Sequence, residues 1–156
     1  MKFRAIWPRS TADIEFREGI ERYRSRIEHF FPIEIVEVAP EKGRHQKNNT
    51  AIIHAESTRL MAAIPAQGLV VTVDERGKSM SSLSFARWLE DITSHNPHGV
   101  SFVMGGDLGL DDALRSRADL VLSLSAMTLP HQIARLVLLE QLYRACTIMR
   151  NIRYHK

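Results

Sequence analysis

The chain has 156 residues, and its hydrophobic content of 44% and charged content of 25% are ordinary for a globular protein. We therefore expect a single domain spanning residues 1–156. No run approaches the roughly 20 apolar residues of a membrane helix, and the first residues lack the apolar core of a signal peptide, so neither a membrane protein nor a secreted one is expected. The formal net charge of +3 is too small to identify a partner.

Strand and helix patterns alternate through the first half of the chain. In order, they predict a strand at 3–7, a helix capped by Ser10 or Thr11, a strand at 33–38, and a helix capped by Asn48 or Asn49 that ends near Pro65. The polar segment at 40–48 is expected to be a loop.

The alternation continues through the second half. The patterns predict a strand at 69–73, a loop at 74–78, a helix capped by Ser81 or Ser82 with Leu83 inside, a strand at 100–104, a short helix capped by Asp111 or Asp112, and a strand at 120–124. The strand at 69–73 is continuously apolar, which indicates burial on both faces, as in parallel sheets. The chain therefore predicts an α/β fold, with a mostly parallel sheet and helices on both faces.

The last predicted helix, from His131 to about Arg150, is apolar nearly all the way round. Its main polar break is a narrow stripe of Glu140, Arg144 and Thr147. A helix that is apolar on every side must be buried on every side. The sheet can cover one side, and the simplest cover for the other is a second copy of the chain across a two-fold interface. The alternative is a core helix beneath long loops.

The single cysteine, Cys146, lies within this apolar helix and has no disulfide partner in the sequence. Such cysteine usage is typical of a reducing compartment, so we expect a cytoplasmic location. We interpret Cys146 as a small core residue rather than a nucleophile.

Ligands of open α/β sheets bind beyond the carboxyl ends of the strands. Three buried strands end here at Val73, Met104 and Leu124. The glycine pair 105–106 either lets the backbone approach a ligand or makes a tight turn. Residues 125–129 either surround an adenine with backbone groups and apolar walls or simply connect two elements. The G-G-x-x-G run matches neither a dinucleotide fingerprint nor a P-loop, so nucleotide phosphates are not the expected cargo.

Other chemistries have weaker support. His95 and His98 are separated by a proline and lack an acidic or cysteine cluster, so no metal site is expected. Ser125 and His131 lack the G-x-S-x-G elbow of a hydrolase. Basic residues mixed with aromatic rings occur in the tail 150–156, and further basic residues occur at 42–47. They suit an RNA backbone with an unstacked base, although ordinary surface charge explains them equally well.

Several segments resemble one known family in the same order along the chain. They are LSLSAMTLPH at 122–131, EQLYRA at 140–145, the terminal Tyr154-His155-Lys156, VTVD at 71–74 with Gly77-Lys78, and FVMGG at 102–106 with Gly109-Leu110. Together they resemble the RlmH family, bacterial methyltransferases of the SPOUT superfamily that act on large-subunit ribosomal RNA.

This resemblance implies an α/β-knot fold with a C-terminal trefoil knot, and S-adenosylmethionine bound in the knot at a homodimer interface. It also implies methylation of N3 of a pseudouridine in 23S rRNA of assembled ribosomes, with no metal. The implied donor contacts are Val73, Gly105, Gly106, Leu124, Ser125, Ala126, Met127, Thr128 and Leu129. The implied substrate-side residues are His131, Arg144, Tyr154 and His155.

The implied chemistry gives these side chains hypothetical roles. His155, with Arg144 or Arg153, would help N3 lose its proton, and Tyr154 would stack on the extruded base. Two other hypotheses stay open, a non-enzymatic RNA-binding dimer and a methyltransferase with another RNA target.

The sequence departs from the family pattern at three places. The pair 107–108 is Asp-Leu where the family usually has Pro-Glu, Gln132 replaces a common proline, and Ile152-Arg153 replaces a frequent His-Pro. The terminal Tyr-His pair is retained.

Overall fold

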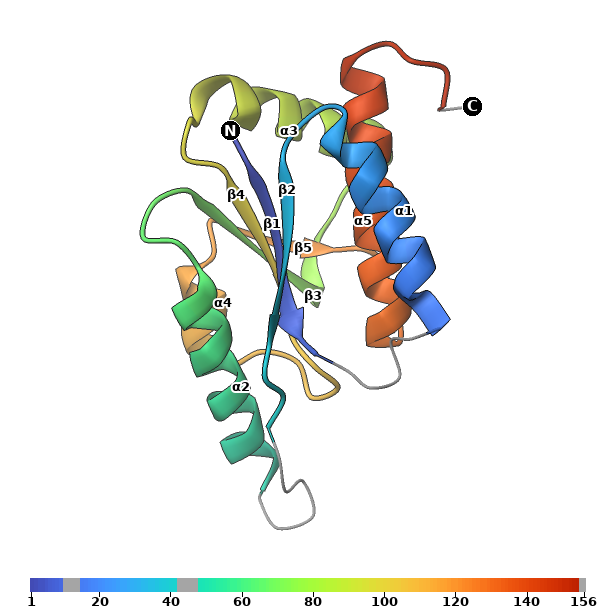
Figure 1. Ribbon diagram of the computed structural model, residues 1–156. Helices are drawn as coiled ribbons and strands as arrows, with labels where there is room; N and C mark the ends of the chain where they lie inside the picture. The colour runs from blue at the N-terminus through green and yellow to red at the C-terminus, as the bar shows by residue number, and fades with distance from the viewer. Residues whose placement is uncertain (10–14, 42–47, 155–156) are drawn as a thin grey trace.

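The computed structural model describes residues 1–9, 15–41 and 48–154 (Figure 1). Five strands form one sheet in the order β2-β1-β4-β3-β5, and every pairing is parallel. The strands are β1 (Phe3–Pro8), β2 (Ile33–Val38), β3 (Leu69–Ser79), β4 (Val100–Met104) and β5 (Leu120–Ser123). The five predicted strands are confirmed, and the predicted parallel sheet with them.

Helices cover both faces of the sheet, as predicted (Figure 1). They are α1 (Arg17–Glu28), α2 (Asn49–Ala63), α3 (Ser82–His95), α4 (Asp112–Arg117) and α5 (His131–Met149). The larger apolar core joins one face of the sheet to α1, α3 and α5, and a smaller core joins the other face to α2 and α4. None of the described helices is long and apolar enough to span a bilayer.

Side-chain caps fix the starts of three helices. Asn48, Ser81 and Asp111 each accept a hydrogen bond from the backbone N–H three residues later, which confirms the predicted caps of α2, α3 and α4. For α1, the predicted caps Ser10 and Thr11 lie outside the described residues. This helix begins at Arg17, with Phe16 at the N-cap and no side-chain cap.

The prediction of a loop at 74–78 was wrong, because β3 continues to Ser79. Val73 and Lys78 both pair with Leu122 of β5, so residues 74–77 bulge out of the ladder and the strand then returns to it. At Gly77 the two backbones lie so close that a Cβ would sit 2.7 Å from backbone atoms of Val121 and Leu122. Because the bulge is polar, its residues predicted a loop rather than a strand that returns to the ladder.

Leu83 was also predicted wrongly, since it is 46% exposed rather than inside. The buried face of α3 is set by Phe85 and Leu89, four residues apart. Leu83 precedes Phe85 by two positions, which turns it about 200° away on a helix of 3.6 residues per turn.

Helix α5 is covered on the sheet side by the core and is flanked by α1 and α3 (Figure 1). Cys146 is buried as expected, and burial raises the pKa of its thiol to about 12. Thr147, predicted in the polar stripe, is also buried and donates to the carbonyl of Arg144 at 2.7 Å. Ile133 remains 39% exposed. The second copy and the trefoil crossing stay predictions.

Candidate active site

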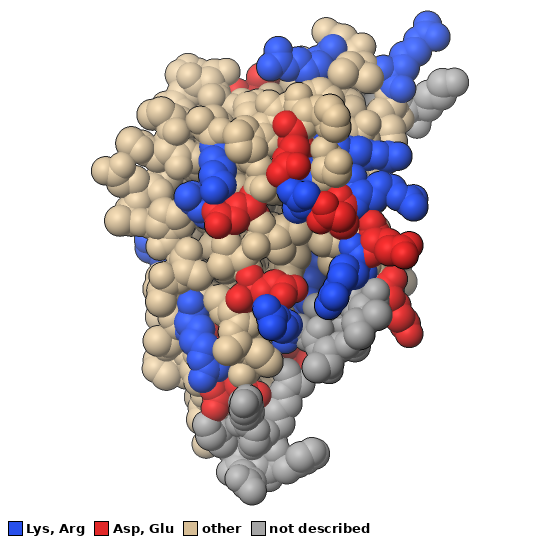
Figure 2. Space-filling view, viewed as in Figure 1, with Lys and Arg blue, Asp and Glu red and all other residues tan. Residues whose placement is uncertain are grey.

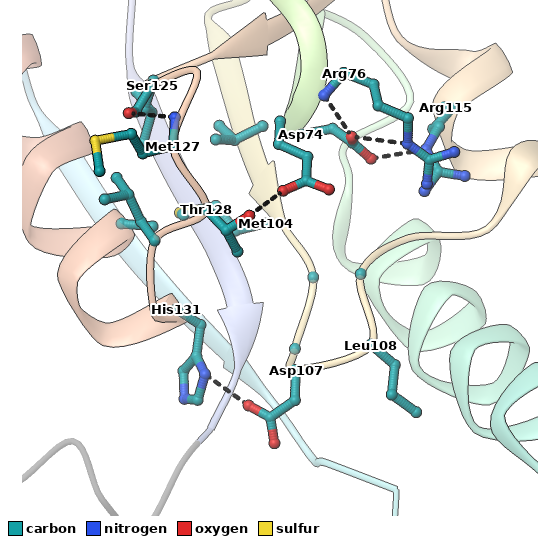
Figure 3. Close-up of a pocket in the computed structure, with 18 residues that line it drawn as sticks. Asp74, Arg76, Met104, Asp107, Leu108, Arg115, Ser125, Met127, Thr128 and His131 are labelled. Carbon is teal, nitrogen blue, oxygen red and sulfur yellow. Dashed lines mark hydrogen bonds and ion pairs between the residues drawn. The ribbon is translucent and has the colours of Figure 1, made fainter.

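Three loops meet at one edge of the sheet and enclose a cavity of about 280 Å³ (Figure 3). Two of them follow β4 and β5, and the third is the bulge at residues 74–77 within β3. The three strands lie side by side and parallel, so these segments reach the same edge of the sheet. The predicted donor residues that line the cavity are Val73, Gly105, Gly106, Leu124, Ser125, Met127, Thr128 and Leu129. The structure thus brings together residues from three segments that are distant in sequence.

Ala126 is the predicted donor residue that does not line the cavity, and it is exposed. Met127 donates its backbone N–H to the Ser125 hydroxyl at 2.9 Å, and this tight turn leaves Ala126 at its apex. Its proposed contact with the cofactor remains a prediction.

The glycine-rich run after β4 is a closed turn that borders the cavity. Gly109 donates its N–H to the carbonyl of Gly106 at 3.0 Å and has φ +82, a conformation that suits glycine. A Cβ on Gly105 would lie 2.4 Å from the carbonyl oxygen of Gly109. Both interpretations of this motif therefore apply, because a tight turn presents its bare backbone to the cavity.

The loop after β5 is tied to the bulge of β3. The Thr128 hydroxyl donates to Glu75 Oε2 at 2.9 Å, and the Ser123 hydroxyl donates to the carbonyl of Ser125 at the same distance. These bonds fix the loop that lines one side of the cavity.

A charged pair that the sequence reasoning missed forms part of the cavity wall. Arg115 Nε donates to Asp74 Oδ2 at 2.8 Å, and the Arg76 N–H donates to Asp74 Oδ1 at 3.0 Å (Figure 3). Burial opposes the charge on Asp74, yet these donors hold the pKa of its carboxyl below the usual range. For Asp74 the available signals were its position directly after the apolar run at 69–73 and its place at the end of the family-like VTVD segment. Arg115 had no such signal.

His131, a predicted substrate-side residue, lies at the first position of α5 and lines the cavity. Its Nδ1 is 2.6 Å from Oδ1 of Asp107, which occupies the turn after β4 (Figure 3). This contact joins the loops that follow β4 and β5. From the sequence, Asp107 was noted only as a difference from the residue that the family usually has at this position.

The other described substrate-side residues, Arg144 and Tyr154, do not line the cavity. Arg144 lies roughly 20 Å from His131 along α5, at about 1.5 Å rise per residue. Glu140 accepts from Arg144 Nε at 2.9 Å, an i,i+4 pair on α5, and from the Tyr154 hydroxyl at 3.2 Å. His155 lies outside the described residues.

Tyr154 is held against α5 and α1. The Arg144 guanidinium lies 4.9 Å from the centroid of the Tyr154 ring, and the hydroxyls of Tyr154 and Tyr23 are 3.4 Å apart. Burial, together with these neighbours, raises the pKa of the Tyr154 phenol, so it stays neutral and can donate a hydrogen bond. Within one chain, the described substrate-side residues therefore form two separate groups, His131 in one and Arg144 with Tyr154 in the other.

Among the described residues, no group of three His, Cys, Asp or Glu side chains could hold a metal ion.

Comparison with known proteins shows to which family the chain is related. A family model described as "Predicted SPOUT methyltransferase" matches residues 1–155. The chain belongs to the SPOUT methyltransferase family. Relatives called "Ribosomal RNA large subunit methyltransferase H" support this. One from Trichlorobacter lovleyi is 40% identical over 158 residues, 99% of each chain, and one from Gemmatimonas aurantiaca is 43% identical over 139 residues, 89% of each chain.

Solved structures support the SPOUT fold. A probable methyltransferase from Bordetella pertussis Tohama I superposes with a TM-score of 0.59 at 16% sequence identity, covering 93% of each chain. At this identity the likeness shows the fold alone.

The cavity suits S-adenosylmethionine, the methyl donor of SPOUT methyltransferases. Val73, Leu124 and Leu129 provide apolar surface for an adenosine, and the turn at 105–109 provides backbone without side chains at its first two positions. The Asp74–Arg115 pair offers charges of both signs, which match the ammonium and carboxylate of an amino-acid group. The cavity volume is near the lower end of the ~300–1,000 Å³ range of small-molecule sites.

Proposed function

We propose that the protein transfers a methyl group from S-adenosylmethionine to large-subunit ribosomal RNA, with N3 of a pseudouridine in 23S rRNA as the acceptor. The observation that supports it most is that three loops carrying family-like residues converge on one cavity. Relatives such as the one 40% identical over its full length are named for methylation of this RNA class.

The residues of the cavity would hold the donor by backbone groups and apolar walls. Bound S-adenosylmethionine supplies an electrophilic methyl group. The tasks left to the chain are to orient this group, to exclude water and to accept the proton of N3. His131 is the described imidazole on the cavity wall, which supports a role for it on the substrate side.

The protein is further proposed to act as a homodimer in which Arg144, Tyr154 and His155 of one copy complete the cavity of the other. A two-fold axis across α5 would place the carboxyl half of one helix beside the amino half of its partner. This arrangement would offset the roughly 20 Å that separates the two groups in one chain. Exposed apolar side chains near the cavity, Met127 at 76% and Ile133 at 39%, are available for such a contact.

The assembled ribosome in the cytoplasm is the proposed substrate. Figure 2 shows basic and acidic side chains interspersed over the viewed face, so recognition by one large basic surface is not supported there. Exposed Arg150 and Arg153 follow α5 and could bind the RNA backbone near Tyr154. The basic residues at 42–47 lie outside the described residues.

Mass mapping of 23S rRNA tests this proposal. Ribosomes from a strain lacking the gene are incubated with purified protein and isotope-labelled S-adenosylmethionine. One added methyl group on one pseudouridine is expected. Methylation of another RNA would contradict the substrate assignment. Absence of both methylation and calorimetric heat with S-adenosylmethionine would favour a non-enzymatic RNA-binding dimer.

A further inference from the structure

The contact between Asp107 and His131 is built on two rigid pieces of backbone. Asp107 is the second residue of the hydrogen-bonded turn from Gly106 to Gly109. Beneath it, Glu56 is buried, and a Cβ on Gly106 would lie 2.8 Å from Glu56 Oε2, so this turn has little room to move. His131 is anchored by α5, whose first backbone bond runs from the Ala134 N–H to the carbonyl of Pro130 at 2.9 Å.

The chemistry of the contact fixes which imidazole nitrogen is basic. An ionised carboxylate can only accept hydrogen bonds, so Nδ1 of His131 carries the hydrogen at 2.6 Å from Asp107 Oδ1. Nε2 of the neutral ring then holds the lone pair. The start of α5 also favours a negative charge nearby. The same arrangement orients the histidine base in hydrolytic triads.

We propose that His131 is the general base that accepts the N3 proton, and that Asp107 is its positioning residue. This inference rests on the proposed function and assigns the base to the cavity instead of the tail. The N3–H bond breaks and its proton passes to Nε2. The nitrogen pair forms the bond to the methyl carbon, and the electrons of the broken carbon–sulfur bond stay on sulfur. Asp107 stabilises the imidazolium until its proton passes to water.

The part of the chain that the structure describes places other charges around the same cavity. They are Asp74, Glu75, Arg76 and Arg115. The Asp74 carboxyl is bonded to Arg115 and to the Arg76 backbone, and Glu75 is bonded to Thr128. His131 itself forms its ion pair with Asp107, at 2.6 Å.

The tautomer of His131 can be measured without any reaction. Nitrogen-15 NMR of the wild-type protein at neutral pH is expected to show a protonated Nδ1 and an unprotonated Nε2. Asp107→Asn should lose this preference, because an amide can accept or donate. Asp91→Asn is the matched control, since it alters an exposed Asp–His pair on α3 whose Nδ1–Oδ1 distance is 3.3 Å. A wild-type Nε2–H tautomer would overturn the positioning role.

Methylation kinetics test the base itself. His131→Gln is expected to lower kcat at least about 100-fold, and Asp107→Asn roughly 10-fold or more, with Kd for S-adenosylmethionine changed less than about 3-fold. Imidazole added to His131→Gly should restore part of the rate.

The outcomes separate this inference from the proposed function. Wild-type kcat in folded His131→Gln and Asp107→Asn proteins would overturn the base and its positioning residue alone. A wild-type protein that does not methylate ribosomal RNA would overturn the proposed function, and the base role with it. Circular dichroism of each variant establishes that it is folded before its rate is compared.

Discussion

Asp74 lies on the cavity wall, and its charge also bears on the stability of the fold. Its side chain is only 7% exposed, and it accepts from Arg115 and from the backbone of Arg76 on the cavity wall. Burial alone would raise its pKa, but the donors prevail and the pKa is lowered. A carboxyl whose folded pKa lies below its unfolded pKa contributes stability above the unfolded value. That contribution is lost as the pH falls through the folded pKa.

Asp74→Asn tests this linkage. The variant should be less stable than the wild type at pH 7, and the difference should shrink as the pH falls below about 4, where the unfolded carboxyl gains its proton. Urea denaturation at a series of pH values measures it. Asp91→Asn, at a carboxylate 76% exposed, is the control and should show no such convergence. A stability difference for Asp74→Asn that is the same at pH 3 and pH 7 would contradict the role of the charge.

Residues of the candidate site were predictable where chain topology alone places them. Gly105 and Leu124 directly follow buried parallel strands, and Val73 is the last residue of β3 before its bulge. The ends of such strands meet at one edge whatever the packing details. Arg115 and Asp107 reach the cavity only through the path of a short helix and a turn, which hydrophobic periodicity does not encode. The roles of all these residues at the site remain predictions.

At the scale of elements, the ladder between β3 and β5 explains why the cavity has the shape it does. The strand leaves the ladder after Val73 and rejoins it at Lys78, so the intervening bulge supplies one wall. The strands and the helix caps could be predicted from the sequence, because apolar runs and cap residues are local signals. The return of β3 to the ladder with β5 could not be predicted, because it depends on a close approach between two backbones.

Gly77→Ala tests that close approach. A Cβ would lie 2.7 Å from the backbone of Val121 and Leu122, which cannot move as a flexible side chain can. We expect a loss of about 1–3 kcal/mol in the free energy of unfolding, and weaker binding of S-adenosylmethionine because the bulge shifts. Urea denaturation and calorimetry measure the two effects.

Gly19→Ala is the contrast for that variant. Its added Cβ would meet the flexible Leu136 side chain, whose nearest terminal carbon is 3.0 Å away, and alanine favours a helix by up to ~1 kcal/mol. Gly77→Ala should therefore be the more damaging of the two. Equal stability of the two variants would contradict the proposed tight contact between β3 and β5.

At the scale of the whole molecule, α5 is buried in part by other elements of its own chain and in part remains exposed. The sequence pattern indicated burial on every side but could not say which neighbours provide it, because α1 and α3 of the same chain and a second copy offer equivalent apolar surface. The structure places α1 and α3 beside α5 and leaves Ile133 partly exposed. The described substrate-side residues, His131 on one hand and Arg144 with Tyr154 on the other, lie toward opposite ends of this helix.

Mixed dimers decide whether the site is shared between two copies. If His131 of one chain works with Tyr154 of its partner, a dimer of one His131→Gln chain and one Tyr154→Ala chain contains one intact site and one doubly altered site. Random assembly of equal amounts makes half of the dimers mixed, so co-expressed variants should recover about one quarter of wild-type methylation. Each variant alone should be nearly inactive. Sites contained within single chains would give no recovery, since every chain would then carry one defect.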